Sequence, residues 1–182
     1  MSANEFMNEK TISSRNVFDG RLLKIDVLDV ELDSGVQTVR EIVRHPGTAV
    51  ILGELADGRF ILVRQFRKAV ERELLEAVAG TLEKGENPSD CAMREFEEET
   101  GYRIDKLRSL GPVCLAPGYS AEVLHMFHAF LDSEQGEANP DDDEKLDVVH
   151  VSKDQLKEMI ASGEIIDAKT LAIWTLYQMM EK

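Results

Sequence analysis

Hydrophobic and polar residues alternate over much of the first quarter of the chain, with the two-residue period that is typical of β-strands. Residues 22–32 alternate, and the turn-forming sequence Asp-Ser-Gly follows at 33–35. Residues 36–43 then alternate again, which predicts the returning arm of a hairpin. We therefore expect residues 17–44 to form antiparallel strands joined by tight turns.

Short apolar runs between turn signals predict the strands of a second region. They lie at residues 48–52, 59–65, 73–79, 102–113, 121–131 and 146–151. Two further segments, of about ten residues from Ser152 and from near Asp167 to the end, favour helices. This order of elements is typical of a layered α/β or α+β fold. We expect an N-terminal β-hairpin region at 1–44 and a main domain at 45–182.

One helix has unusually clear boundaries. Asn87 is a good N-cap, Pro88 suits the first helical position, and Gly101 is well placed to end the helix in a left-handed conformation. The sequence therefore predicts a helix from residue 88 to about residue 100.

Composition and charge exclude several classes of protein. With 182 residues, 43% of them apolar, the chain is long enough for one domain with a substantial core. Its net charge of −14 argues against nucleic acid as the main partner. No run approaches eighteen apolar residues and no secretory signal is recognisable, so we expect no membrane partner and a cytoplasmic protein. Cys91 and Cys114 are interpreted as small buried hydrophobic residues.

The glutamates at the end of the predicted helix suggest a metal site. Glu95, Glu98 and Glu99 are spaced i, i+3, i+4 and therefore share one face. An anion at a helix C-terminus is disfavoured by roughly 0.3–1 kcal/mol, and the like charges also repel. A solvated acidic face is the alternative interpretation. A divalent cation among oxygen ligands also explains the arrangement, and such ligands would suit Mg²⁺, with Mn²⁺ as a second choice. The run taken alone leaves both interpretations open.

These glutamates belong to a longer pattern over residues 80–102. The segment fits G-x5-E-x7-R-E-U-x-E-E-x-G-U, where U is apolar or aromatic, through Gly80, Glu86, Arg94, Glu95, Phe96, Glu98, Glu99, Gly101 and Tyr102. Seven fixed identities arise by chance with a probability on the order of 10⁻⁸ per starting position. The pattern is the Nudix box, and the sequence closely resembles that family.

The resemblance implies a fold and a set of roles. The fold would be a Nudix α/β/α sandwich with a mixed β-sheet, preceded by antiparallel N-terminal strands. Glu95 and Glu99, supported by Glu98 and the backbone carbonyl of Ala79, would hold the divalent ions. Arg94 would orient the glutamates. Glu86 is similarly expected to support the loop and the helix. The metal ions would polarise a diphosphate and activate water.

Residues outside the box resemble the branch of the family that acts on ADP-ribose and other nucleoside diphosphate sugars. Pro117 lies sixteen residues after the last glycine of the box, in a segment that ends at Glu122. Arg67 is expected to meet the diphosphate, for which a guanidinium is well shaped. Arg40 and Glu41 resemble positions that contact the nucleotide or the terminal ribose. Ordinary turns and surface ion pairs are the alternatives.

Two acidic segments add further candidates by the same resemblance. In the run Asp-Asp-Asp-Glu at 141–144, Asp142 would be the general base and Glu144 would lie near the metal; a mobile solvated loop is the alternative. Asp167 and Lys169 resemble an Asp-x-Lys pair of nucleoside diphosphate sugar hydrolases that would bind substrate. Asp167 is also a normal helix cap.

The resulting hypothesis is a homodimeric, metal-dependent hydrolase of nucleoside diphosphate sugars, in which the N-terminal strands are exchanged between subunits. ADP-ribose is the leading substrate, and sugar nucleotides such as GDP-mannose are further candidates. The rivals are a non-catalytic sensor that binds ADP-ribose and a Nudix nucleoside triphosphate pyrophosphatase.

Overall fold

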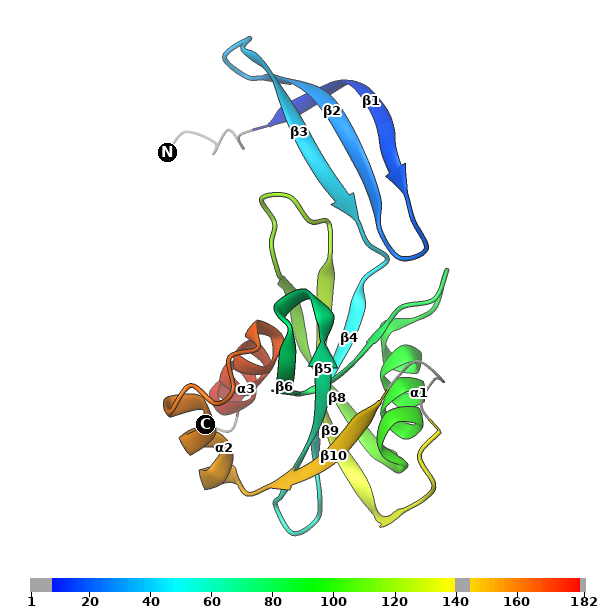
Figure 1. The fold of residues 1–182 in the computed structure, drawn as a ribbon, viewed down its shortest axis with the longest axis vertical. Helices are drawn as coiled ribbons and strands as arrows, with labels where there is room; N and C mark the ends of the chain where they lie inside the picture. Colours follow the sequence, from blue (N-terminus) through cyan, green and yellow to red (C-terminus); the bar gives the residue numbers. More distant parts are fainter. Residues whose placement is uncertain (1–7, 140–144, 181–182) are drawn as a thin grey trace, which may run out of the picture. The chain divides into compact units, whose positions relative to one another are not determined.

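The structure is a computed structural model that describes residues 8–139 and 145–180 (Figure 1). The chain forms two compact units. The N-terminal unit contains the residues up to His45 together with Ala116–Glu122, and the main unit contains Pro46–Leu115 and the residues from Val123 onward. Among the described residues, no helix is both long and apolar enough to cross a membrane.

The N-terminal unit is a three-stranded antiparallel sheet with the order β1-β2-β3. Its strands are β1 (Glu9–Asp19), β2 (Lys24–Leu32) and β3 (Gln37–Arg44). The hairpin expected over 22–43 is confirmed. The first strand, however, begins at Glu9 and not near residue 17, because its first half is polar and exposed and gives no apolar alternation.

The segment 116–122 attaches to the end of β3 by backbone hydrogen bonds. The amide of Val43 donates to the carbonyl of Tyr119 at 2.8 Å, and the amide of Ala121 donates to the carbonyl of Val43 at 2.9 Å. The loop that contains Pro117 is therefore part of the N-terminal unit.

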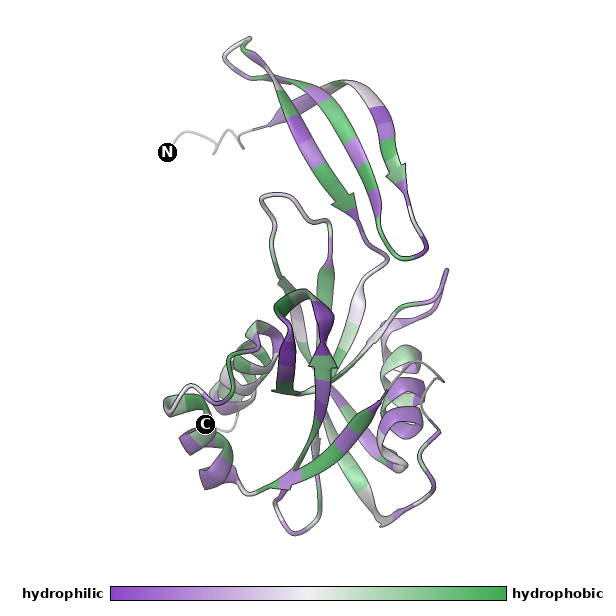
Figure 2. Ribbon diagram, in the orientation of Figure 1, coloured by the Kyte–Doolittle hydropathy of each residue, from purple (hydrophilic) through white to green (hydrophobic). Residues whose placement is uncertain are grey.

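This unit exposes much apolar surface. Figure 2 shows hydrophobic and hydrophilic bands alternating along its strands. Of the residues that the structure describes in this unit, Val27 and Val30 are the only buried hydrophobic ones. Among the described residues of the unit, eight large hydrophobic side chains are exposed, namely Ile12, Val17, Phe18, Leu22, Leu23, Val36, Val39 and Tyr119.

The main unit contains a seven-stranded mixed sheet. The strands are β4 (Thr48–Glu54), β5 (Phe60–Arg67), β6 (Arg72–Glu76), β7 (Val78–Thr81), β8 (Tyr102–Cys114), β9 (Val123–Gln135) and β10 (Leu146–Val151). Their order is β10-β5-β4-β9-β8, and β6 pairs with β5 while β7 pairs with β4. The pairing of β4 with β9 is parallel and the others are antiparallel.

The sequence predicts one strand at 73–79, but the structure has two. After the 3₁₀ turn η1 (Lys68–Val70), β6 pairs with β5 as far as Glu76, opposite Val63. The chain then changes partner, and β7 pairs with β4 from Val78, opposite Ile51. Ala77 is the residue at which the partner changes. The apolar run contains no signal for this break, because the break depends on contacts with elements that are distant in the sequence.

Helices cover both faces of the main sheet (Figure 1). Helix α1 (Pro88–Thr100) packs on one face through Cys91, Ala92 and Phe96. Helices α2 (Lys153–Ala161) and α3 (Ala168–Met180) cover the other face, where Leu156 and Ile173 are fully buried. The expected α/β/α sandwich with a mixed sheet is thereby confirmed.

Candidate active site

The box segment forms a strand, a loop and a helix. Gly80 lies in β7, the loop follows, and the side chain of Asn87 caps α1 by accepting a hydrogen bond from the amide of Ser89. Gly101 ends the helix with φ 74°, in the left-handed region that favours glycine, and its amide donates to the carbonyl of Glu97. The predicted start and end of this helix are both confirmed.

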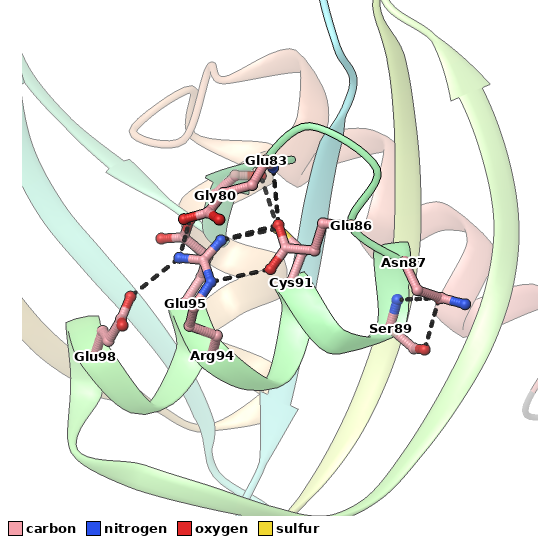
Figure 3. A network of polar contacts seen from close by, with 9 residues as sticks. All are labelled: Gly80, Glu83, Glu86, Asn87, Ser89, Cys91, Arg94, Glu95 and Glu98. Atoms are coloured by element: carbon pink, nitrogen blue, oxygen red, sulfur yellow. Dashed lines mark hydrogen bonds and ion pairs between the residues drawn. The ribbon is translucent and has the colours of Figure 1, made fainter.

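Arg94 lies at the centre of a carboxylate cluster (Figure 3). Its Nε and Nη2 donate to the two oxygens of Glu86 at 3.0 and 3.1 Å. Its Nη1 donates to Glu95 at 2.8 Å and to Glu98 at 3.2 Å. These hydrogen bonds, those with Glu86 first, raise the pKa of Arg94, so the guanidinium stays charged. One cation thus orients three glutamates that come from the loop and from two turns of α1.

Glu86 also fixes the loop that precedes the helix. Its Oε2 accepts a hydrogen bond from the backbone amide of Glu83 at 2.8 Å. The hydrogen bonds from Arg94, and then the one from Glu83, hold the pKa of Glu86 below its usual value. The loop is therefore tied to α1 through an ionised carboxylate.

Helix α1 approaches β7 closely at Gly80. A Cβ atom on Gly80 would lie 2.0 Å from Cδ of Glu95, so only glycine leaves room for that carboxylate. Glu99, one turn further along, is 4% exposed. The Glu95 carboxylate therefore lies against the strand that carries Ala79.

The donor groups of this region suit a hard divalent cation in type and charge. Glu95, Glu98 and Glu99 all provide carboxylate oxygens, and Arg94 balances only part of their negative charge. Within residues 8–139 and 145–180, no three acidic, histidine or cysteine side chains already form a metal cage. Glu95 and Glu98 would exchange hydrogen bonds with Arg94 for bonds to an ion.

The two cysteines differ in their environment. Cys91 is buried beneath the box, and its Sγ lies 3.6 Å from the carbonyl oxygen of Gly80. Burial, aided by the charges of Glu86 and Glu95, raises the pKa of the Cys91 thiol to about 12. Cys114 is exposed at the end of β8, so the expectation that it is buried is wrong. Side chains alternate between the two faces of β8, and Cys114 falls on the exposed face next to the half-buried Val113.

A second ionic cluster joins β5, β6 and the start of α3. The buried carboxylate of Glu76 accepts hydrogen bonds from Arg67 Nε at 2.9 Å and Nη2 at 2.7 Å. Lys169 Nζ also donates to Glu76, and it lies 3.1 Å from Asp167 Oδ2. The structure thus brings together Arg67, Asp167 and Lys169, three of the predicted substrate-binding residues. The Arg67 side chain remains 41% exposed.

Glu76 stays ionised although it is buried. Burial alone would raise its pKa, but the hydrogen bonds from Arg67 and the charge of Lys169 outweigh burial and leave the pKa of Glu76 below its usual value. The role of Glu76 as shared partner of both cations was not expected from the sequence. The sequence does contain one signal for a buried carboxylate, since Glu76 is a lone acidic residue between the apolar positions 75 and 77.

The other predicted substrate-binding residues belong to the N-terminal unit. Arg40 lies on β3 and forms an ion pair with Glu9 at 2.6 Å, while Glu41 is exposed beside it. Pro117 is exposed, and Glu122 lies 3.7 Å from His45 Nδ1. The remaining two candidates, Asp142 and Glu144, lie outside the described residues.

The site consists of an acidic loop and helix on an α/β/α sandwich, and an arginine donates hydrogen bonds to its glutamates. This arrangement is that of a metal-dependent hydrolase of the Nudix type. Comparison with known sequences agrees, since the family described as NUDIX domain matches residues 43–172. The chain therefore belongs to the Nudix family and is a Nudix hydrolase, a class that generally needs a divalent metal ion.

Similar proteins span nearly the whole chain. The ADP-ribose pyrophosphatase of Bacillus subtilis (strain 168) is 41% identical over 165 residues, which cover 90% of this chain and 89% of the relative. The methanol dehydrogenase activator of Bacillus methanolicus is 36% identical over 97% of this chain and 96% of its own length. The GDP-mannose pyrophosphatase of Yersinia enterocolitica is 31% identical over 88% of this chain and 87% of the relative.

A solved structure described as an ADP compounds hydrolase has the same fold. It aligns with a TM-score of 0.82 at 22% identity and covers 94% of this chain and 93% of its own. At this level of identity the likeness supports the fold and not the substrate.

Proposed function

We propose that this protein hydrolyses the diphosphate bond of nucleoside diphosphate sugars, with ADP-ribose as the leading substrate and GDP-mannose as a further one. The products are a nucleoside monophosphate and a sugar phosphate. The observation that carries the proposal is the complete box, in which Arg94 holds Glu86, Glu95 and Glu98 at 2.8–3.2 Å. The similarity to the pyrophosphatases of ADP-ribose and GDP-mannose favours this class of substrate.

The cofactor in this proposal is Mg²⁺, with Mn²⁺ as the alternative. Glu95, Glu98 and Glu99, together with the backbone carbonyl of Ala79, would hold the ions. When bound, such ions supply charge stabilisation for the diphosphate and lower the pKa of a water molecule. Arg94 holds the carboxylates of Glu95 and Glu98 by charged hydrogen bonds, which supports their assignment to one site. The role of Asp142 as the general base remains a prediction, and so does the position of Glu144 near the metal.

Arg67 and Lys169 are proposed to bind the anionic part of the substrate. Both are held by Glu76, and Asp167 lies beside Lys169, so this cluster of two cations and two anions has no net charge. The exposed part of the Arg67 guanidinium can then donate hydrogen bonds to a diphosphate oxygen at modest desolvation cost. Arg40, Glu41, Pro117 and Glu122 are proposed to contact the nucleotide or the terminal sugar.

We further propose a homodimer in which the N-terminal strands are exchanged between subunits. The described part of the small N-terminal unit has eight exposed large hydrophobic residues, which is more than a solvated unit of this size needs, and this supports the proposal. Exchange of these strands would bring a subunit's Arg40 and Glu41 to its partner's site.

The test is a turnover panel in the presence of Mg²⁺ with ADP-ribose, GDP-mannose, ADP-glucose, UDP-glucose, NADH and dGTP, with products separated by ion-exchange chromatography. Turnover of ADP-ribose and other sugar nucleotides, without dGTP, supports the proposal. Turnover of dGTP alone would instead support a nucleoside triphosphate pyrophosphatase.

If no compound is cleaved, the non-catalytic alternatives gain support. One alternative is a sensor that binds ADP-ribose. A second is a protein that activates a dehydrogenase, which the similarity to the methanol dehydrogenase activator suggests. Isothermal titration with ADP-ribose and a coupled dehydrogenase assay separate these two cases.

A further inference from the structure

The strand that carries Ala79 depends on a single irregular residue. Up to Glu76 the chain pairs with β5, and from Val78 it pairs with β4. Ala77 lies between the two strands and belongs to neither. Because Ala77 is 1% exposed, its backbone amide needs an acceptor other than water or a strand partner.

A side chain from the last helix supplies that acceptor. The amide of Ala77 donates a hydrogen bond to Thr170 Oγ1 at 2.8 Å, across 93 residues of sequence. Thr170 is itself 1% exposed, so the hydrogen bond is shielded from water.

The Thr170 hydroxyl has a fixed orientation. Its Oγ1 donates to Asp167 Oδ2 at 2.6 Å, and the same carboxylate oxygen accepts from the amide of Thr170 at 3.0 Å. With its hydrogen directed to Asp167, the hydroxyl presents lone pairs to Ala77. The start of α3 therefore determines where the strand changes partner.

The residues that follow Ala77 form one wall of the candidate site. Ala79 lies opposite Val50 and Gly80 opposite Ala49, and the Glu95 carboxylate packs directly on Gly80. A shift of the backbone at Ala77 would move the carbonyl of Ala79 and the contact with Glu95 together.

We propose that Thr170 is a positioning residue, which fixes the strand switch at Ala77 and thereby sets the carbonyl of Ala79 against Glu95 for divalent-cation binding. This inference rests on the proposed function, since it takes these two groups as cation ligands. Thr170 acts through the backbone and does not itself contact a substrate or an ion.

The experiment compares Mn²⁺ binding to the full chain, without substrate, by electron paramagnetic resonance. Thr170→Val keeps the shape of the side chain but removes the acceptor, and we expect it to weaken Mn²⁺ binding by about 10- to 100-fold. Thr170→Ser restores the hydroxyl and should bind within about threefold of the unsubstituted protein. If Thr170→Val does not fold, Thr170→Ala removes the same acceptor without a branched side chain.

Thr175→Val is the matched control. Thr175 is on the same helix, but its hydroxyl is exposed and donates to the carbonyl of Leu171 at 2.8 Å. This variant should bind Mn²⁺ as the unsubstituted protein does. Hydrogen exchange of the Ala77 amide, followed by NMR, should accelerate in Thr170→Val and in neither Thr170→Ser nor Thr175→Val.

The outcomes separate this inference from the proposed function. If the unsubstituted protein binds Mn²⁺ and Thr170→Val binds equally well, Thr170 has no positioning role. An equal loss in Thr170→Ser would also overturn the inference, because the hydroxyl would not be the cause. Failure of the unsubstituted protein to bind Mn²⁺ would overturn the proposed function itself, and the inference with it.

Discussion

At the level of single residues, Arg94 donates hydrogen bonds to three carboxylates at distances of 2.8–3.2 Å. Without the Arg94 guanidinium, the carboxylates of Glu86, Glu95 and Glu98 would repel one another at close range. The arrangement makes sense when the carboxylates are kept close together for a further cation. Arg94 then acts as a template for the site, in addition to stabilising α1.

Glu76 offers a test of the second ionic cluster. Its pKa in the folded protein lies below the value of 4.5 for an unperturbed glutamate, so its ionised form stabilises the fold at neutral pH. That contribution is lost as the pH falls through the folded-state pKa, below about 4.5. Glu76→Gln should lower the free energy of unfolding by about 1–3 kcal/mol at pH 7 and by progressively less below pH 4.5. Urea denaturation at several pH values measures the difference.

Glu73→Gln is the matched control for this measurement. Glu73 lies on the same strand but is exposed, and its substitution should change the free energy of unfolding by less than about 0.5 kcal/mol. A Glu76→Gln difference that stays constant from pH 7 to pH 3 would contradict the assignment.

Contacts within one helix could be predicted from the sequence, whereas contacts between distant elements could not. Arg94 and Glu98 are four residues apart on α1, so their contact follows from helix geometry. Lys169 meets Glu76 across 93 residues, and no local pattern reports such a pair. The family resemblance brought out Arg67 and Lys169, but the buried carboxylate that joins them became visible only in the fold.

At the level of elements, the site depends on how closely α1 approaches β7. A methyl group on Gly80 would overlap the Glu95 carboxyl carbon, which lies 2.0 Å from the Cβ position. We expect Gly80→Ala to displace Glu95 and to lower kcat/KM for ADP-ribose by at least about 100-fold, while circular dichroism still reports a folded protein.

The control for this variant is Gly58→Ala, in the turn between β4 and β5. No atom lies within 4 Å of a Cβ atom there, although φ is +83°. Gly58→Ala should lower stability by about 1 kcal/mol through backbone strain and leave turnover unchanged. Equal turnover in Gly80→Ala and the unsubstituted protein would contradict the close-packing argument.

Element boundaries were predictable where local chemistry determines them. Asn87, Pro88 and Gly101 define α1, and Ser152 caps α2 through a capping box with Gln155. The division between β6 and β7 was missed because Ala77 changes partner for a tertiary reason. The start of β1 was missed because a strand that is exposed along its whole length needs no apolar alternation.

At the level of the whole molecule, the proposed homodimer, which the exposed apolar residues of the N-terminal unit support, can be tested directly. Size-exclusion chromatography with light scattering should give twice the chain mass of 20.4 kDa. Phe18→Asp, at a side chain that is 54% exposed, should shift the protein toward monomer, because a charge in an apolar interface is costly to desolvate.

Val70→Asp serves as the control for Phe18→Asp. Val70 is 53% exposed and belongs to the main unit, and its substitution should leave the molecular mass unchanged. A monomer in the unsubstituted protein, at concentrations used for the assays, would rule out the exchange of strands between subunits.

If the box glutamates support metal-dependent cleavage of a nucleoside diphosphate sugar, Glu99→Gln should abolish that cleavage. ADP-ribose hydrolysis is followed by ³¹P NMR for both proteins, with Mg²⁺ and with EDTA. We expect the unsubstituted protein to release AMP and ribose 5-phosphate only with Mg²⁺, and Glu99→Gln to lower kcat by several orders of magnitude while it unfolds at a similar temperature. Turnover by Glu99→Gln at the rate of the unsubstituted protein would show that Glu99 is not a metal ligand, and turnover that EDTA does not abolish would show that the cleavage needs no divalent ion.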